Sequence, residues 1–225
     1  MHGMPCPLSM GYLWAIMGTH GQEAIILRRL EEALMVSQEL RDRLERAREI
    51  AEPLKRKLFV LGVITAALHP YGVRPILIGG GAVEYYTFGG YSTKDTDLAV
   101  ADYRRLDEVL AQLGFRKLGR FWLRDDLDSV VEAPAGVLAG EEAPLTTVEV
   151  DGLTAFVLGV EDLTIDRLNG FVHWHWKADG RWAERLIALH GADMDWAYLH
   201  RRALAVGTDA ELSCMEKAWQ EGRLG

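Results

Sequence analysis

The segment from Ile76 to Val100 constrains the fold more than any other part of this chain. It begins as a short apolar strand, continues through the glycine turn Gly79-Gly80-Gly81 into a short helix, and ends in a second strand that carries Asp95 and Asp97. Strands joined through a glycine turn and a helix indicate a mixed sheet with packed helices. We therefore expect an α+β (mixed α/β) fold.

The two aspartates on the second strand indicate a metal site. Residues two apart on a strand point to the same face, so the Cα atoms of Asp95 and Asp97 should lie roughly 6.5–7 Å apart. Two carboxylates at this spacing can share one or two Mg²⁺ ions, which prefer oxygen ligands. A glycine turn that opens a helix is also a favourable phosphate site, because free N–H groups and the helix dipole point outward there. The pattern suggests nucleoside triphosphate chemistry.

The remaining patterns divide the chain into three expected parts. Residues 1–53 would form an N-terminal arm and a long helix, 54–158 the core, and 159–225 a C-terminal helical region. Leucines at helical spacing predict one helix over Gln22–Glu52, which Pro53 interrupts. In the core and C-terminal region the patterns predict helices over Leu54–Leu68, Asp102–Leu113, Val160–Phe171, Arg181–His190, Met194–Val206 and Asp209–Gly222, and strands over Pro75–Ile78, Phe121–Arg124, Asp128–Glu132, Thr146–Val150 and Leu153–Leu158.

Composition limits the classes of partner. The chain has 225 residues, a net charge of −8 and a pI near 5.4, which disfavours nonspecific binding to DNA or to anionic membranes. No apolar run is long enough to span a bilayer, and the first twenty residues lack the basic start of a signal peptide. Cys6 and Cys214 form no motif, so we expect a reduced, cytoplasmic setting.

Two ordered motifs resemble the nucleotidyltransferase superfamily, which has a DNA polymerase beta-like fold. They are Ile78-Gly79-Gly80-Gly81-Ala82 and Thr93-Lys94-Asp95-Thr96-Asp97-Leu98. The helix start from Gly159 to Leu168 resembles the AbiEii/MenT branch, which contains toxin-type nucleotidyltransferases and relatives of unassigned function.

The resemblance implies a mechanism. Asp95, Asp97 and a third acidic residue on a neighbouring strand would hold two Mg²⁺ ions, which bind the triphosphate of an NTP and activate an acceptor hydroxyl for attack on the α-phosphate. Gly79, Gly80 and Thr93 would line the phosphate site, and Arg167 would neutralise the triphosphate tail. The acceptor would be tRNA, as for the toxins, or a small-molecule hydroxyl. An antitoxin protein and a homo-oligomer formed through the N-terminal helix are possible partners.

The identity of the third acid stays open between three residues. Asp128 and Glu132 share one face of a predicted strand, and Glu149 lies between two valines on another. We expect Glu132, because it ends an apolar run just before Ala133-Pro134, as a partner strand should.

Other chemical motifs have simpler interpretations. His173 and His175 could suggest zinc, but aromatic packing with Trp174 and Trp176 is the stronger interpretation. The basic run Arg116, Lys117, Arg120 and Arg124 could contact a nucleic acid backbone, although a solvated hairpin face explains it more simply.

Two functions of different classes follow. The first is an Mg²⁺-dependent nucleotidyltransferase. The second is a catalytically degenerate module that binds a nucleotide, RNA or a partner protein, because the helix from Arg181 lacks an Arg-Asp pair typical of the AbiEii branch and because Glu replaces the usual Asp at the third acidic position. A dinucleotide-binding oxidoreductase is disfavoured, since the three glycines are contiguous rather than spaced as G-x-G-x-x-G.

Overall fold

A mixed sheet of seven strands lies at the centre of the described structure. The computed structural model describes residues 35–135 and 144–224. The strands are β1 (Ile76–Leu77), β2 (Asp95–Ala99), β3 (Arg116–Leu118), β4 (Phe121–Arg124), β5 (Ser129–Ala135), β6 (Leu145–Val150) and β7 (Leu153–Leu158). They are arranged in the order β3-β4-β5-β2-β1-β7-β6, with parallel pairing between β2 and β5 and between β1 and β7. The expected mixed α/β architecture is confirmed.

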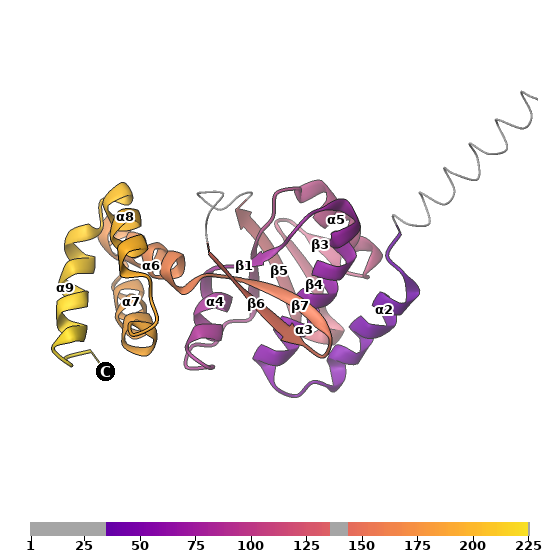
Figure 1. Ribbon diagram of the computed structural model, residues 1–225. Helices are drawn as coiled ribbons and strands as arrows, with labels where there is room; N and C mark the ends of the chain where they lie inside the picture. Colours follow the sequence, from indigo (N-terminus) through magenta and orange to yellow (C-terminus); the bar gives the residue numbers. More distant parts are fainter. Residues whose placement is uncertain (1–34, 136–143, 225) are drawn as a thin grey trace, which may run out of the picture. The chain divides into compact units, whose positions relative to one another are not determined.

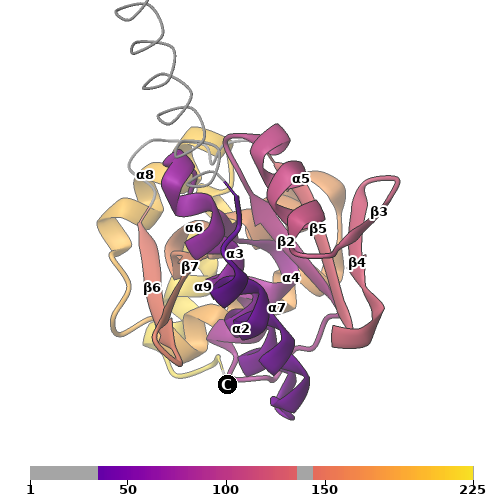
Figure 2. The same ribbon diagram turned by 90° about the vertical axis from the view of Figure 1, so that its right-hand side faces the viewer.

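Helices pack on one face of this sheet and form a C-terminal layer. The helices are α2 (Gln38–Glu45), α3 (Pro53–Leu68), α4 (Gly79–Tyr86), α5 (Tyr103–Gln112), α6 (Val160–Trp174), α7 (Lys177–His190), α8 (Trp196–Val206) and α9 (Asp209–Gln220), with short 3-10 turns at Arg46–Glu49, His69–Tyr71 and Asp125–Leu127. Helix α3, with α2 packed against it, crosses the sheet (Figure 2). Helices α6 to α9 gather beside α4 (Figure 1). None of the described helices has the length and apolar character required of a membrane span.

Side chains that alternate along the strands create one buried face and one partly open face. On β2, Thr96 and Leu98 are buried, whereas Asp95 and Asp97 are partly exposed. The buried face packs against α3, whose Val60 lines a small cavity together with Thr96. The two aspartates therefore lie on the face opposite α3.

Local sequence signals explain several predicted elements. Helix α5 is capped by Asp102, whose Oδ1 accepts the backbone N–H of Arg105 at 3.0 Å. Asp151 and Gly152 have φ angles of +48° and +73°, which is the geometry of a two-residue hairpin turn between β6 and β7. The predicted hairpin and the helices that became α3 and α5 are confirmed.

The prediction of one helix over Gln22–Glu52 is wrong in its described part. Helix α2 begins at Gln38 because the extended residue Ser37 caps it, accepting the N–H of Leu40 at 3.2 Å. A 3-10 turn follows α2, and Ile50 is again extended. Strand β3 was not predicted; it pairs with β4 although all three of its residues are exposed.

The contacts group Ser37–Gly225 as one unit and Met1–Val36 as another. The proposed N-terminal arm and the first half of the predicted long helix lie outside the described residues. The division of the chain at residues 54 and 159 stays a prediction.

Candidate active site

The parallel pairing of β2 with β5 brings three carboxylates to one face of the sheet. Asp97 pairs directly with Glu132, and Asp95 pairs with Val130. Residues paired across neighbouring strands, and residues two apart on one strand, point to the same face. Asp95, Asp97 and Glu132 therefore lie together on the partly open face, on two adjacent strands near the middle of the sheet.

The charges of these groups affect one another. The pKa of Asp97 is raised, first by burial and then by the negative charges of Glu132 and Asp95. A hydrogen bond from the Gly80 backbone and the positive charge of Lys57 oppose this rise without cancelling it. The cluster therefore carries excess negative charge, which is the electrostatic setting of a cation site.

The carboxylates are not arranged as a complete ligand set. Within residues 35–135 and 144–224, no three His, Cys, Asp or Glu side chains are placed so that they could hold a metal ion. Glu132 is instead paired with Arg120, whose Nε lies 3.1 Å from Oε1 of Glu132. Arg120 sits on the turn between β3 and β4 with 74% of its side chain exposed, whereas the Glu132 side chain is 11% exposed. A metal ion would compete with Arg120 for this carboxylate.

The two remaining candidate acids lie elsewhere. Glu149 is on β6, at the far edge of the sheet, where its Oε1 accepts a hydrogen bond from Thr154 Oγ1 at 2.7 Å. Asp128 precedes β5 in an exposed turn with φ +47° and lines a small cavity with Thr96, on the face that packs against α3. Of the three acids, Glu132 is the neighbour of Asp97.

The glycine turn lies directly against Asp97. Gly79 has φ +57°, and a Cβ atom built on it would lie 2.6 Å from Oδ2 of Asp97. The backbone N–H of Ile78 donates to the Asp97 carbonyl oxygen at 2.9 Å, and Gly80 donates to the Asp97 carboxylate. Both the positive φ and the close approach require glycine at position 79. The turn and the carboxylates thus form one site.

The loop before β2 closes over Gly80. A Cβ at Gly80 would lie 3.0 Å from Cε1 of Tyr91 and 3.3 Å from Cγ2 of Thr93, so the predicted residue Thr93 does adjoin the turn. The Thr93 carbonyl accepts a hydrogen bond from Lys57 Nζ at 3.0 Å, and Lys57 also forms a buried ion pair with Glu84. This ion pair ties α3 and α4 to the loop. The sequence patterns do not single out Lys57 or Tyr91, because Lys57 is one of three consecutive basic residues at the start of an otherwise apolar helix.

Arg167 lies on α6 and already has protein partners. Its Nη1 donates to Oδ1 of Asp179 at 3.0 Å, and its guanidinium also binds the carboxylate of Asp166. Burial alone would lower the pKa of Arg167, but the charges of Asp166 and Asp179 raise it overall. Tyr91 also interacts electrostatically with Arg167, and its ring meets that of Trp182 edge to face at 5.0 Å. Tyr91 therefore links the glycine turn to α6 and α7.

The basic run does not form one continuous surface. Arg124 is buried, where it binds Glu45, Asp126 and the Leu113 carbonyl. Lys117 pairs with Asp107 at 2.9 Å. This agrees with a hairpin that has a solvated face and a buried aromatic side, because Trp122 is buried.

The two histidines have no shared metal geometry in the described structure. His173 Nε2 lies 2.9 Å from the Val206 carbonyl oxygen, and His175 ends α6 in a left-handed conformation. The rings of Trp174 and Trp176 pack at 5.5 Å, as expected for an aromatic cluster.

Comparison with known proteins yields structural similarities only. No protein-family model matches the chain, and no curated protein sequence matches it. Two solved structures are similar. The first is an antigenic nucleotidyltransferase-like protein from Paracoccidioides brasiliensis, with a TM-score of 0.49 and 19% identity over 75% of this chain and 94% of that chain. The second is the antibiotic-resistance factor ANT(2'')-Ia, with a TM-score of 0.37 and 16% identity over 70% of this chain and 88% of the other. Because both TM-scores are below 0.5, the functional assignment rests on the residues of the chain itself.

Proposed function

We propose that this chain is an Mg²⁺-dependent nucleotidyltransferase that transfers a nucleoside monophosphate from an NTP to a hydroxyl group. One observation carries the proposal. Asp95, Asp97 and Glu132 share one partly open face of the sheet, and the Gly79–Gly80 turn touches this cluster. A clustered set of carboxylates beside a glycine turn at a helix start combines the oxygen ligands that Mg²⁺ prefers with the kind of backbone that favours a phosphate.

Each residue of the cluster has a defined part in this proposal. Asp95, Asp97 and Glu132 would hold Mg²⁺, which when bound neutralises triphosphate charge and activates the acceptor hydroxyl. Their fit to a cation is supported by the raised pKa of Asp97, which is caused first by burial and then by the negative charges of Glu132 and Asp95. Gly79 and Gly80 would keep side chains away from the phosphates, and Thr93, whose Cγ2 methyl lies beside Gly80, would line the same site.

Arg167 would neutralise the end of the triphosphate. The contact of Tyr91 with Gly80, together with its interaction with Arg167, supports a location of this arginine on the side of the glycine turn. Asp166 and Asp179 hold the guanidinium in place, so an arriving phosphate would share it with these carboxylates or displace them.

The acceptor is proposed to be tRNA, on the basis of the toxin-type resemblance, with a small-molecule hydroxyl as the alternative substrate. If tRNA is the acceptor, an antitoxin protein is the expected partner, and the reaction belongs in the cytoplasm.

A catalytically degenerate binding module is the second candidate. Two observations favour it. Arg120 forms an ion pair with Glu132, which would otherwise be available to a metal ion. The backbone N–H of Gly80 is hydrogen-bonded to Asp97 rather than free to bind a phosphate. Such a module would bind a nucleotide, RNA or a protein without releasing pyrophosphate.

One experiment separates these two functions. The purified chain is incubated with each of the four NTPs, α-³²P-labelled, with total tRNA, and with either Mg²⁺ or EDTA. The nucleotidyltransferase releases pyrophosphate and labels an acceptor only with Mg²⁺. Calorimetric binding of an NTP that is equal with and without Mg²⁺, with no pyrophosphate released, would instead establish the binding module.

A further inference from the structure

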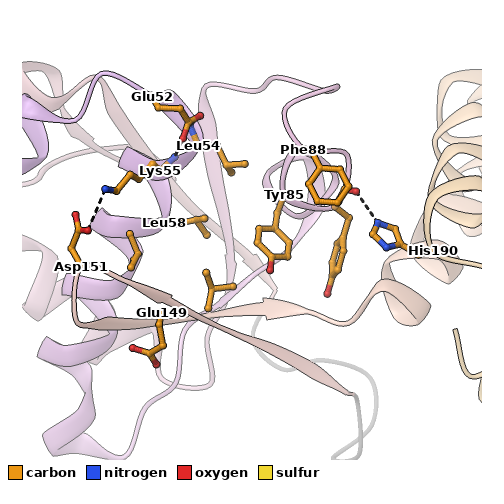
Figure 3. Close-up of a pocket in the computed structure, with 12 residues that line it drawn as sticks. Glu52, Leu54, Lys55, Leu58, Tyr85, Phe88, Glu149, Asp151 and His190 are labelled. Atoms are coloured by element: carbon orange, nitrogen blue, oxygen red, sulfur yellow. Dashed lines mark hydrogen bonds and ion pairs between the residues drawn. The ribbon is translucent and has the colours of Figure 1, made fainter. Parts of the chain in front are cut away.

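A cavity of about 570 Å³ lies on the face of the sheet opposite the carboxylates. Its walls come from the first turns of α3, the end of α4, strand β6 and His190 at the end of α7 (Figure 3). Strand β6 contributes Val148, which pairs with the fully buried Ala155 and so faces α3 rather than the carboxylate side. Its volume lies in the range of small-molecule sites, about 300–1,000 Å³. The proposed catalytic reaction makes no use of this cavity.

The interior of the cavity is aliphatic and aromatic. Leu54 and Leu58 of α3 point into it, and the ring of Tyr85 lies between these leucines and Phe88 (Figure 3). Phe88 stands at its mouth beside His190, with ring centroids 6.0 Å apart. The lining therefore offers flat apolar contacts to a ligand.

Phe88 has an unusual conformation for its residue type. It has φ +53° at the position following the end of α4, where a glycine normally stands, and it is 78% exposed. A bulky side chain in the left-handed region is strained, and strain of this kind gathers at functional sites. The backbone thus holds a phenyl ring in solvent at the entrance of an apolar cavity.

The charged groups at the mouth already have protein partners. Both oxygens of Glu52 cap α3, where they accept N–H groups of its first turn. Lys55 Nζ lies 3.2 Å from Oδ1 of Asp151, and Glu149 points away from the cavity and binds Thr154. The Tyr85 hydroxyl has no hydrogen-bond partner among residues 35–135 and 144–224, so it is free to bind a ligand.

We propose that this cavity is a second binding site, which takes a neutral, largely aromatic small molecule with one group that hydrogen-bonds to Tyr85. Neutrality follows from the partnered charges at the mouth, and aromatic character follows from the rings of Tyr85 and Phe88. The site is independent of the proposed nucleotidyl transfer, so either can fail without the other.

A matched pair of fluorescent probes tests the proposal. N-phenyl-1-naphthylamine is neutral and has one N–H group, and 8-anilinonaphthalene-1-sulfonate is the same skeleton with a negative charge. The full chain is titrated into a low concentration of each probe. We expect the neutral probe to bind with a Kd on the order of 100 μM, as its size allows, and the anionic probe to bind at least tenfold more weakly. No binding of the neutral probe, or equal binding of both, would overturn the proposal.

Three variants locate the probe. Val148→Trp fills the cavity and should weaken binding of the neutral probe at least tenfold. Thr147→Trp adds the same ring to the preceding residue of β6, which points to the opposite face, and should leave binding unchanged. Tyr85→Phe should weaken binding of the neutral probe about threefold to tenfold, because it removes one hydrogen bond. Thermal melting confirms that each variant is folded. Equal effects of the two tryptophan variants would show that the probe binds elsewhere.

Discussion

Asp97 and Glu132 are direct neighbours across the parallel pairing of β2 and β5, although they come from strands separated by α5 and the β3–β4 hairpin. Both side chains lie on the face opposite α3, with the backbone of Gly79 against the Asp97 carboxylate. This relationship makes Asp97 the centre of the site, and it leads to predictions on stability, on the glycine turn and on metal binding.

The charge of Asp97 should destabilise the metal-free fold. A carboxyl group whose pKa is raised on folding binds its proton more tightly in the native state, so its ionisation favours unfolding at neutral pH. Asp97→Asn should therefore melt at a higher temperature than the wild type in EDTA at pH 7. This difference in melting temperature should appear as the pH rises above 3.8, the ordinary pKa of an aspartate, and should be complete above the raised native pKa. At about pH 3 the two proteins should melt at the same temperature.

Asp128→Asn is the matched control for this melting experiment. It makes the same chemical change in an exposed turn, and Asn tolerates the φ of +47° at this position. Its melting temperature should follow that of the wild type. An Asp97→Asn protein that melts at or below the wild-type temperature at pH 7 would show that the Asp97 charge is already balanced.

Gly79→Ala should damage both stability and activity. The added Cβ meets the Asp97 carboxylate at 2.6 Å, and φ is +57°. We expect transfer activity to fall by at least about 100-fold, because Asp97 must move.

Gly72→Ala is the control, since Gly72 has φ +67° but no atom within 4 Å of a new Cβ. It should cost about 1–2 kcal/mol of stability and leave the rate unchanged. Equal loss of activity in both variants, measured by pyrophosphate release, would argue against a special role for Gly79.

Removal of Arg120 should make metal binding easier. Arg120 competes with Mg²⁺ for Glu132, and exposed ion pairs contribute about 0.2–1 kcal/mol. Arg120→Ala should therefore lower the Mg²⁺ concentration for half-maximal activity by at most about fivefold. Arg116→Ala, which removes a neighbouring charge paired with Asp125 instead, should leave it unchanged. A higher Mg²⁺ requirement in Arg120→Ala would mean that Arg120 supports the site rather than blocks it.

Arg124 should stabilise the fold without affecting chemistry. It ties β4 to α2 through Glu45 and also binds Asp126 and the Leu113 carbonyl, and its side chain is 10% exposed. Arg124→Met should lower the free energy of unfolding by about 2–3 kcal/mol in urea denaturation. Arg48→Met is the control: Arg48 binds the same two acids but is 52% exposed, so its loss should lower the free energy of unfolding much less than the loss of Arg124 does. Equal losses would show that burial does not strengthen these bonds.

Elements with strong local signals could be predicted from the sequence. Asp102 caps α5, and Asp151-Gly152 turns the β6–β7 hairpin, because short side-chain contacts and positive φ angles decide these points. The start of α2 could not be predicted, since the leucine pattern continues on both sides of Ser37. A single capping bond, from the Leu40 N–H to the Ser37 side chain, sets where α2 begins. Strand β3 is exposed throughout, so no alternation marks it, and pairing with β4 alone makes it a strand.

Some features of the candidate site could also be predicted from the sequence, and others could not. The spacing of Asp95 and Asp97 predicts a shared face, because strand geometry is local. The contacts of Lys57 with Thr93 and of Tyr91 with Gly80 depend on how α3 and the loop before β2 pack, which no local pattern contains. The pairing of Glu132 with Arg120 likewise requires the β3–β4 hairpin to fold back beside β5.

Metal binding by Asp97 tests the central claim most directly. Mn²⁺ is titrated into the wild type, Asp97→Asn and Asp128→Asn in the presence of a non-hydrolysable NTP, and free Mn²⁺ is followed by electron paramagnetic resonance; pyrophosphate release is measured in parallel with the natural NTP. The proposed site predicts that the wild type and Asp128→Asn bind Mn²⁺ equally, and that Asp97→Asn loses this binding together with its pyrophosphate release. Unchanged Mn²⁺ binding and unchanged pyrophosphate release in Asp97→Asn would contradict it.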